Sequence, residues 1–160
     1  MNLESLVPAR ETCERLRDAG FPAKTAAAWW TYDGGDPYVM TDDQVADLRG
    51  HVEGTFRFVC AAPTLQEVLD ALPPNIIRPP VNEPGGGEWF LTTSALYGST
   101  LVRVCYDSRL GGTMPLGVPH GMASREAGSY VEAAARLWLA LASASLLPPP
   151  EAAQTAEGQR

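Results

Sequence analysis

Residues 124–147, with the sequence SREAGSYVEAAARLWLALASASLL, decide the fold, because they predict one long helix with a single apolar face. Ser124 is expected as the N-cap of this helix, and three consecutive prolines after the segment prevent its continuation. Glu132 and Arg136 are spaced for an i,i+4 ion pair on the polar face. The rest of the chain must supply a surface that covers the apolar face, which consists of Tyr130, Val131, Ala134, Leu137, Trp138 and Leu141.

The chain of 160 residues is long enough for one domain with a well-formed core. Its 45% hydrophobic and 19% charged residues are typical of a globular protein, and its 15 glycines and 14 prolines predict that loops take a large share. We predict a single globular domain over residues 1–147. Residues 148–160 have too little apolar content to fold, and we expect them to form a disordered tail that is Pro-rich and polar.

Charge and hydropathy narrow the choice of partners and of compartment. A formal net charge of -7 is opposite in sign to a surface that binds phosphates, so nucleic acid is disfavoured as a partner. No stretch approaches the ~20 uncharged apolar residues of a membrane span, and the first residues lack the basic and apolar regions of a secretion signal. We therefore expect a cytoplasmic protein of the host cell with no membrane partner.

The first third of the chain predicts two helices and a hairpin. Residues 10–19 have helical spacing, and Gly20 supplies the left-handed residue that ends such a helix. Residues 25–32 are rich in aromatic side chains and predict a strand that turns back towards residues 38–40, although their alanines also allow a helix. Residues 41–50 begin with the capping-box sequence TDDQ and predict a short surface helix.

The middle of the chain predicts a strand, a helix and a second short strand. Residues 55–61 alternate at first and then become wholly apolar, as a strand that enters the core would. Thr64 and Glu67 form a second capping box and open a helix that the prolines at 73 and 74 end. Residues 75–78 are a further strand candidate.

The clearest strands are residues 89–96 and 100–106, which predict an antiparallel hairpin. The segments 79–87 and 111–122 are rich in Gly and Pro and are expected to be loops. We predict one antiparallel sheet that contains the hairpin and residues 55–61. With the N-terminal, middle and C-terminal helices packed on this sheet, the expected fold is an α+β two-layer sandwich.

Metal chemistry has little support in the sequence. The three cysteines, Cys13, Cys60 and Cys105, lie far apart and lack the CxxC spacing of zinc or redox sites, so each is expected to be a small buried side chain. His51 and His120 are the only histidines, which rules out a His-rich metal site. We predict no metal site and no cofactor.

One catalytic arrangement is close enough in sequence to consider. His120 lies in the Gly- and Pro-rich segment 111–122 and could act as a general base for a Cys105 thiol, with Asp107 as the neighbouring carboxylate. This segment and residues 84–89 would then form the pocket. The alternative is that His120 is an exposed loop residue and Cys105 a buried strand residue, and that neither has a catalytic role.

Tryptophans are the candidate binding residues. Trp29 and Trp30, with Tyr32 and Tyr38 nearby, could form a stacking platform for bases or sugars, and Trp89 ends the glycine-rich segment. Lysines and arginines that would accompany a nucleic-acid platform are missing around them. Packing in a core or an interface is the alternative for all three tryptophans.

Three segments carry a resemblance: LVPARETCERLRDAGFP at 6–22, CAAPTLQEVLDALP at 60–73 and EAAARLWLALA at 132–142. In this order they resemble a group of small phage and prophage-encoded proteins of unknown function, which share the patterns LCxxLxxAGFP, APTxxELLxxLP and ALAxLWLxL. The chain departs from the group by Thr12 in place of leucine and by additional residues at 42–52 and 79–87. The resemblance implies a phage or prophage context and carries no catalytic residues.

These observations favour a non-enzymatic accessory protein that acts by binding a protein partner or by self-association. The alternative is a small enzyme or ligand-binding protein whose pocket lies at residues 84–89 and 111–122 and includes His120. A protein that mimics DNA would need its acidic residues along one face, and a net charge of -7 is modest for that role.

Overall fold

The computed structural model describes the chain over residues 3–22, 28–32, 35–49, 57–78, 87–108, 113–117 and 121–147. Helices and antiparallel strands occur together in it, which confirms the predicted α+β class. The helices are η1 (Leu3–Leu6), α1 (Arg10–Asp18), α2 (Asp42–Arg49), α3 (Leu65–Asp70) and α4 (Tyr130–Ser143). The strands are β1 (Ala28–Tyr32), β2 (Tyr38–Thr41), β3 (Arg57–Ala61), β4 (Asn75–Arg78), β5 (Gly87–Ala95), β6 (Val102–Ser108), β7 (Pro115–Gly117), β8 (Gly121–Met122) and β9 (Ser124–Ala127).

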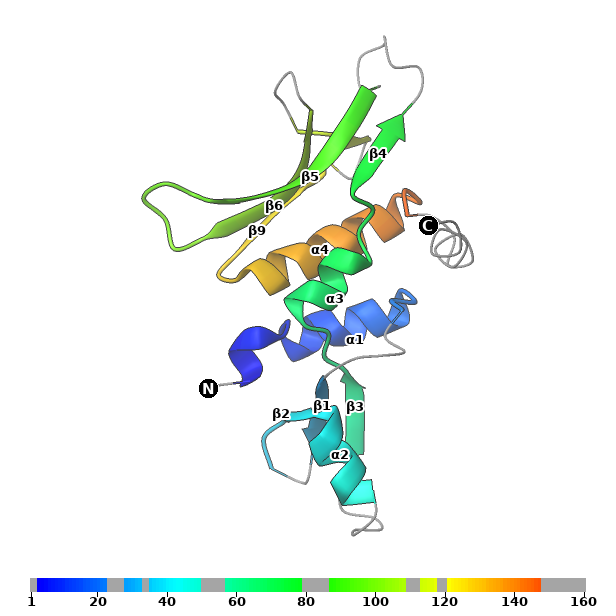
Figure 1. Cartoon of the computed structure of the whole chain (residues 1–160), viewed down its shortest axis with the longest axis vertical. Coiled ribbons are helices and arrows are strands. Elements are labelled where there is room, and N and C mark those ends of the chain that lie inside the picture. The colour runs from blue at the N-terminus through cyan, green and yellow to red at the C-terminus, as the bar shows by residue number, and fades with distance from the viewer. Residues whose placement is uncertain are drawn as a thin grey trace, which may run out of the picture.

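The elements are stacked along the long axis of the molecule (Figure 1). A four-stranded sheet forms one end, α4 and α3 lie beneath it, α1 follows, and a three-stranded sheet with α2 forms the other end. The C-terminal helix therefore packs against a sheet as predicted. However, α1, α3 and α4 form a layer between two sheets instead of covering a single one.

The three-stranded sheet has the order β2-β1-β3 with antiparallel pairings, and β1 forms the predicted hairpin with β2. The prediction that residues 55–61 join the sheet of the later strands was wrong. β3 pairs with β1, where Cys60 lies opposite Trp30. The apolar pattern of β3 reflects burial of Cys60 and Ala62 together with Trp30 and part of α1. Such a pattern indicates burial and does not specify which sheet provides it.

The four-stranded sheet has the order β4-β5-β6-β9 and is antiparallel throughout. β5 and β6 form the predicted hairpin, with Thr92 opposite Cys105 and Leu91 opposite Tyr106. Val104 and Tyr106 are buried in the core around α4. Because side chains alternate along a strand, Arg103, Cys105 and Asp107 lie on the opposite face of the sheet.

The C-terminal helix begins later than predicted. Ser129 is its N-cap, with its hydroxyl accepting a hydrogen bond from the backbone N–H of Glu132, and the predicted cap Ser124 instead starts strand β9. β9 pairs with β6 and covers the edge that β6 would otherwise expose. Gly128 explains the later start, because glycine inside a helix costs about 1 kcal/mol relative to alanine.

Part of the segment 111–122, which the sequence predicts as a loop, forms a small hairpin of β7 and β8. The fully buried Met114 anchors it: the Met114 N–H donates to the Tyr106 carbonyl at 2.8 Å, and the Ala123 N–H donates to the Met114 carbonyl at 2.6 Å. The backbone of Met114 therefore ties this strand pair to β6, and its side chain is buried in the core around α4.

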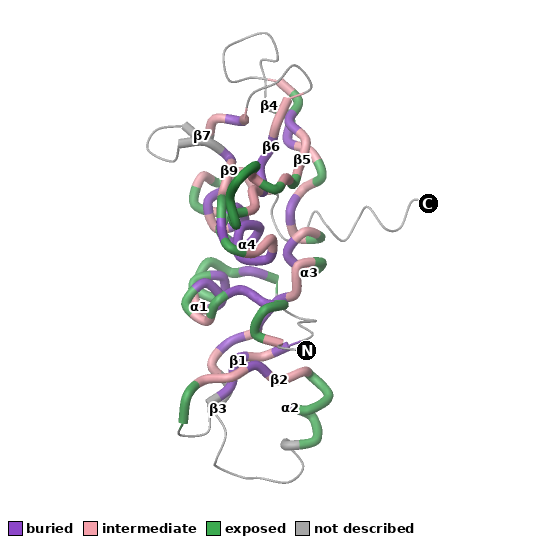
Figure 2. Tube along the Cα trace, turned by 90° about the vertical axis from the view of Figure 1, so that its left-hand side faces the viewer, coloured by how far each residue is buried: buried purple, intermediate pink, exposed green. Residues whose placement is uncertain are grey.

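Buried apolar side chains form two clusters on either side of α1. The larger cluster surrounds α4 and includes Leu16 and Phe21, with the Phe21 ring meeting Trp138 edge to face at a centroid distance of 5.1 Å. The smaller cluster lies against the three-stranded sheet and contains Val7, Cys13, Ala28, Trp30, Val39, Cys60 and Ala62. Figure 2 shows buried residues on the helices and on the strands beside them, whereas α2 is mostly exposed. α1 therefore belongs to both cores.

Two helices end in the same hydrogen-bond motif. At the end of α1 the N–H of Gly20 donates to the Arg17 carbonyl and that of Phe21 to the Leu16 carbonyl, with Gly20 at a φ of +79°, as the sequence predicts. α4 ends with Ser145 in the equivalent position at a φ of 56°. A residue with a side chain in this conformation costs about 1 kcal/mol more than glycine.

The capping box that opens α3 yields a stability prediction. The Thr64 hydroxyl accepts from the Glu67 N–H, and the Glu67 carboxylate accepts from the Thr64 N–H at 2.7 Å. Thr64→Ala should lower the free energy of unfolding by about 1 kcal/mol, because it removes one half of this exchange. Urea denaturation measures the change. Thr64→Ser, which keeps the hydroxyl, should retain most of the stability, and equal losses in both variants would contradict the prediction.

Candidate functional site

A buried carboxylate joins α1 to α4. Glu132 lies in the first turn of α4, and its side chain reaches the N-terminus of α1. It accepts hydrogen bonds from the Ala9 N–H at 3.0 Å, the Thr12 hydroxyl at 2.7 Å and the Arg136 Nε at 2.7 Å. Ala9 is the N-cap of α1 and has no side chain that can cap the helix. Glu132, from a different helix, satisfies the backbone N–H of this N-cap residue, and its negative charge is favourable at a helix N-terminus.

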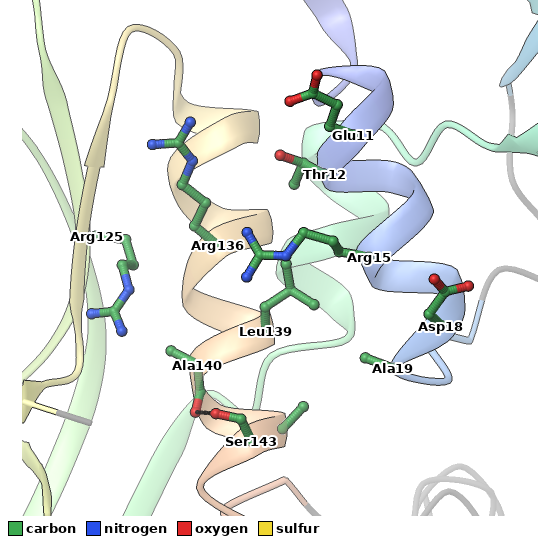
Figure 3. A pocket seen from close by; sticks show the side chains of 11 residues that line it. Glu11, Thr12, Arg15, Asp18, Ala19, Arg125, Arg136, Leu139, Ala140 and Ser143 are labelled. Atoms are coloured by element: carbon green, nitrogen blue, oxygen red, sulfur yellow. Dashed lines mark hydrogen bonds between the residues drawn. The ribbon is translucent and has the colours of Figure 1, made fainter. Parts of the chain in front are cut away.

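A groove with a volume of about 820 Å³ lies alongside this contact. Its lining includes Arg15 from α1, Arg125 from β9 and Arg136 from α4, together with the apolar side chains of Leu139 and Ala140. In Figure 3, Arg15 extends from α1 towards α4, while Arg125 lies on the other side of α4. Three separate elements thus bring three guanidinium groups to one groove.

The charges around the groove favour an anion. Arg136 is tied through Nε to Glu132, and burial lowers the pKa of Arg125, which means that this guanidinium is partly withdrawn from water. Glu11 and Asp18 are the acidic residues of the lining, and Asp18 is paired with Arg17 at 2.8 Å. The lining thus contains two carboxylates and three guanidinium groups, and Arg136 is paired with Glu132 beside the groove, in a chain whose net charge is -7.

Sequence reasoning missed this groove. It placed Arg136 on the polar face of the C-terminal helix, which is correct, but it assigned Arg125 to the same helix instead of to β9. Nothing in the sequence marked Arg15 as a site residue, because a charged residue on a short helix is usually exposed to solvent without a binding role. The Gly128 and Ser129 pair could have revealed the strand that carries Arg125.

The structure brings two of the predicted catalytic residues together. The Cys105 thiol donates to the Asp107 carboxylate at 3.2 Å, and the Thr92 hydroxyl lies 3.2 Å from the same carboxylate oxygen. Thr113 donates to the other oxygen at 2.8 Å. Burial raises the pKa of Cys105, the bond with Thr92 partly offsets this, and Asp107 raises it again. A fully buried thiol in this state is a poor nucleophile, because the thiolate is the reactive form.

His120, the proposed base, lies outside the described residues, as does His51. The predicted pocket segments 84–89 and 111–122 are described only in part, and the described residues that line the groove come from other segments. Within the described part of the chain, no group of three or more His, Cys, Asp or Glu side chains could hold a metal ion.

The three tryptophans do not form a common platform. Trp30 is buried in the smaller cluster and donates from Nε1 to the Pro8 carbonyl at 3.2 Å, while Trp89 is buried in the larger cluster. Trp29 is half-buried on β1, and its Nε1 donates to Asp42 at 3.0 Å. Trp30 and Trp89 are therefore core residues, whereas Trp29 lines a cleft beside α1 and β3.

Comparisons with known proteins identified no matching family model, no matching curated protein and no matching solved structure. Among the described residues, no helix has the length and apolar character that crossing a membrane requires.

The Glu132 contact yields a second stability prediction. Glu132→Gln should lower the free energy of unfolding by about 2 kcal/mol, because the amide nitrogen cannot accept a hydrogen bond from the donors that the carboxylate satisfies. Glu126→Gln on the exposed part of β9 makes the same charge change and should stay within about 0.5 kcal/mol of the wild type. Thermal or urea unfolding of both variants measures the difference. Equal effects would show that the buried contact contributes nothing.

Asp107 yields a prediction of pH dependence. Burial alone would raise its pKa, but hydrogen bonds from Thr113, Cys105 and Thr92 and the charge of Arg103 bring it below the ordinary value of 3.8. A lowered pKa stabilises the fold above the pKa of the unfolded chain, and this contribution is lost as pH falls through the folded value. The stability gap between the wild type and Asp107→Asn should thus be constant from pH 7 to 5 and narrow below pH ~4. A gap that persists undiminished at pH 3 would contradict the assignment.

Proposed function

We propose that this protein is a non-enzymatic binding protein whose groove between α1 and α4 holds an acidic segment of a partner protein. The presence of Arg15, Arg125 and Arg136, from three elements, in the lining of one groove carries the proposal. Arginine is well suited to this task, because its planar guanidinium binds carboxylates through two parallel hydrogen bonds. The Cys105 cluster supports an enzyme less well, since its thiol is buried and its pKa is raised.

The lining of the groove supports a peptide segment as the ligand. Leu139 and Ala140 offer apolar contact between the arginines, which suits apolar side chains that alternate with carboxylates. A long nucleic acid would meet the net charge of -7 over the rest of the molecule, whereas a short segment meets only the groove. A volume of about 820 Å³ is within the range of sites that hold several side chains.

The cellular setting of the proposal follows from the sequence. The three segments that resemble small phage and prophage-encoded proteins support an accessory role in an infected or lysogenic host, and we place the protein in the cytoplasm of that cell. Two of these segments, residues 6–22 and 132–142, contain α1 and most of α4, the two helices that form the groove.

Substitution of Arg15 tests the proposed function. The probe is a fluorescein-labelled peptide of alternating Glu and Leu, and the control peptide has Gln in place of Glu. Arg15→Ala should weaken binding of the acidic peptide by about 3- to 10-fold, as expected for losing an accessible charge-assisted pair. Arg10→Ala is the matched control on the same helix, because Arg10 pairs with Glu14 and does not line the groove. Fluorescence anisotropy measures both affinities.

Two results would overturn the proposal: equal affinity for the Glu and Gln peptides, or equal losses from Arg15→Ala and Arg10→Ala. Light scattering on the same variants identifies the partner further. If Arg15→Ala dissociates an oligomer that Arg10→Ala leaves intact, the acidic segment belongs to a second copy of this chain.

A further inference from the structure

Two cysteines that are far apart in the sequence meet in the structure. Cys13 lies on α1 and Cys60 on β3, and both belong to the smaller buried cluster, with exposed fractions of 1% and 4%. The two elements are tied together by a hydrogen bond of 3.1 Å from Arg17 Nη1 to the Val59 carbonyl. Both cysteines are free thiols in this structure.

The surroundings of the pair give its two sulfurs different reactivity. The Cys13 thiol donates a hydrogen bond to the Pro8 carbonyl at 3.4 Å, and the interaction between the two neighbouring thiols is the main cause of the lowered pKa of Cys60 and of the raised pKa of Cys13. Burial and the charge of Glu14 act in the opposite direction on the pKa of Cys60, and the guanidinium groups of Arg17 and Arg10 lower it again. Cys60 is therefore the sulfur that carries the negative charge most readily.

A cleft leads to the pair. Its volume is about 300 Å³, and its lining includes both cysteines, Arg17, Trp29 and Phe21. This size admits a small molecule, and Arg17, which is also paired with Asp18 at 2.8 Å, is the cationic residue of the lining that an acidic molecule would meet. The sulfurs are thus shielded from bulk water but line a space that a small disulfide can enter.

We propose that Cys13 and Cys60 form a reversible disulfide by exchange with an acidic small-molecule disulfide that enters this cleft. The inference rests on the juxtaposition of two thiols at a cleft with an arginine, and it is independent of the proposed peptide groove.

The exchange proceeds in two steps. The Cys60 thiolate attacks one sulfur of the small disulfide, whose S–S bond breaks, and one small thiolate leaves and takes up a proton. Cys13 then loses its proton to water or to the leaving group and attacks the Cys60 sulfur of the mixed disulfide, which releases the second small thiolate. Two cysteine thiols are thereby oxidised to one disulfide, and one small disulfide is reduced to two thiols.

The test uses the full-length wild-type chain and oxidised glutathione as the probe. After incubation, remaining thiols are alkylated, and peptide mapping by mass spectrometry locates the modified residues. We expect a Cys13–Cys60 crosslink that reduced glutathione reverses, while Cys105 stays a free thiol. Cys105 is the internal control, because it is also buried but lies on β6 in the other half of the molecule. The crosslink should raise the thermal midpoint by roughly 5 to 15 °C, since it closes a long loop.

Two variants assign the roles of the sulfurs. In Cys13→Ser we expect a stable glutathione adduct on Cys60, and in Cys60→Ser an adduct on Cys13 that forms at least 10-fold more slowly. Circular dichroism verifies that each variant folds, and the wild-type crosslink decides the proposal if one does not. A wild-type chain that keeps Cys13 and Cys60 as thiols, forms a crosslink through Cys105, or modifies Cys13 as fast as Cys60 would overturn the proposal.

Discussion

The buried carboxylate of Glu132 fixes where α1 sits on α4, and both hydrophobic clusters depend on that position. Burying a carboxylate costs several kcal/mol unless hydrogen bonds replace its water. Here Ala9, Thr12 and Arg136 provide them, and the first two move with α1. A shift of α1 by one turn would leave the charge without these donors and would withdraw Leu16 from one cluster and Cys13 from the other. One polar contact therefore specifies an arrangement that apolar packing alone would leave open.

The same contact shapes the groove. Arg136 donates through Nε to Glu132. This bond restricts the conformation of the Arg136 side chain and keeps it at the wall of the groove. Glu132 takes part in hydrogen bonds at the N-termini of two helices. Its backbone N–H donates to the Ser129 hydroxyl at the start of α4, and its carboxylate accepts from the Ala9 N–H at the start of α1. Serine followed three residues later by glutamate is the pattern of a local capping box. In this structure the glutamate side chain accepts from the N-cap residue of α1, a helix that lies far away in the sequence, and the serine side chain keeps its local role.

Local signals in the sequence predicted local structure well. The caps at Thr64 and Gly20, the hairpin of β5 and β6 and the Glu132–Arg136 pair are all present, because each depends on residues within a few positions of one another. The sheet that takes β3, the hairpin fixed by Met114 and the meeting of Cys13 with Cys60 depend on partners far along the chain. Periodicity indicates which face is buried and gives no information on what covers it.

α1 is a helix of nine residues that belongs to both hydrophobic clusters and also lines the groove. Cys13 on one face contacts the three-stranded sheet, Leu16 on another enters the core around α4, and Arg15 lines the groove. A change that repositions this helix on one side therefore acts on the others, so we expect the proposed disulfide and the proposed binding groove to be thermodynamically coupled. Such coupling is reciprocal: the factor by which disulfide formation alters the affinity of the groove equals the factor by which an occupied groove alters the tendency of the thiols to oxidise.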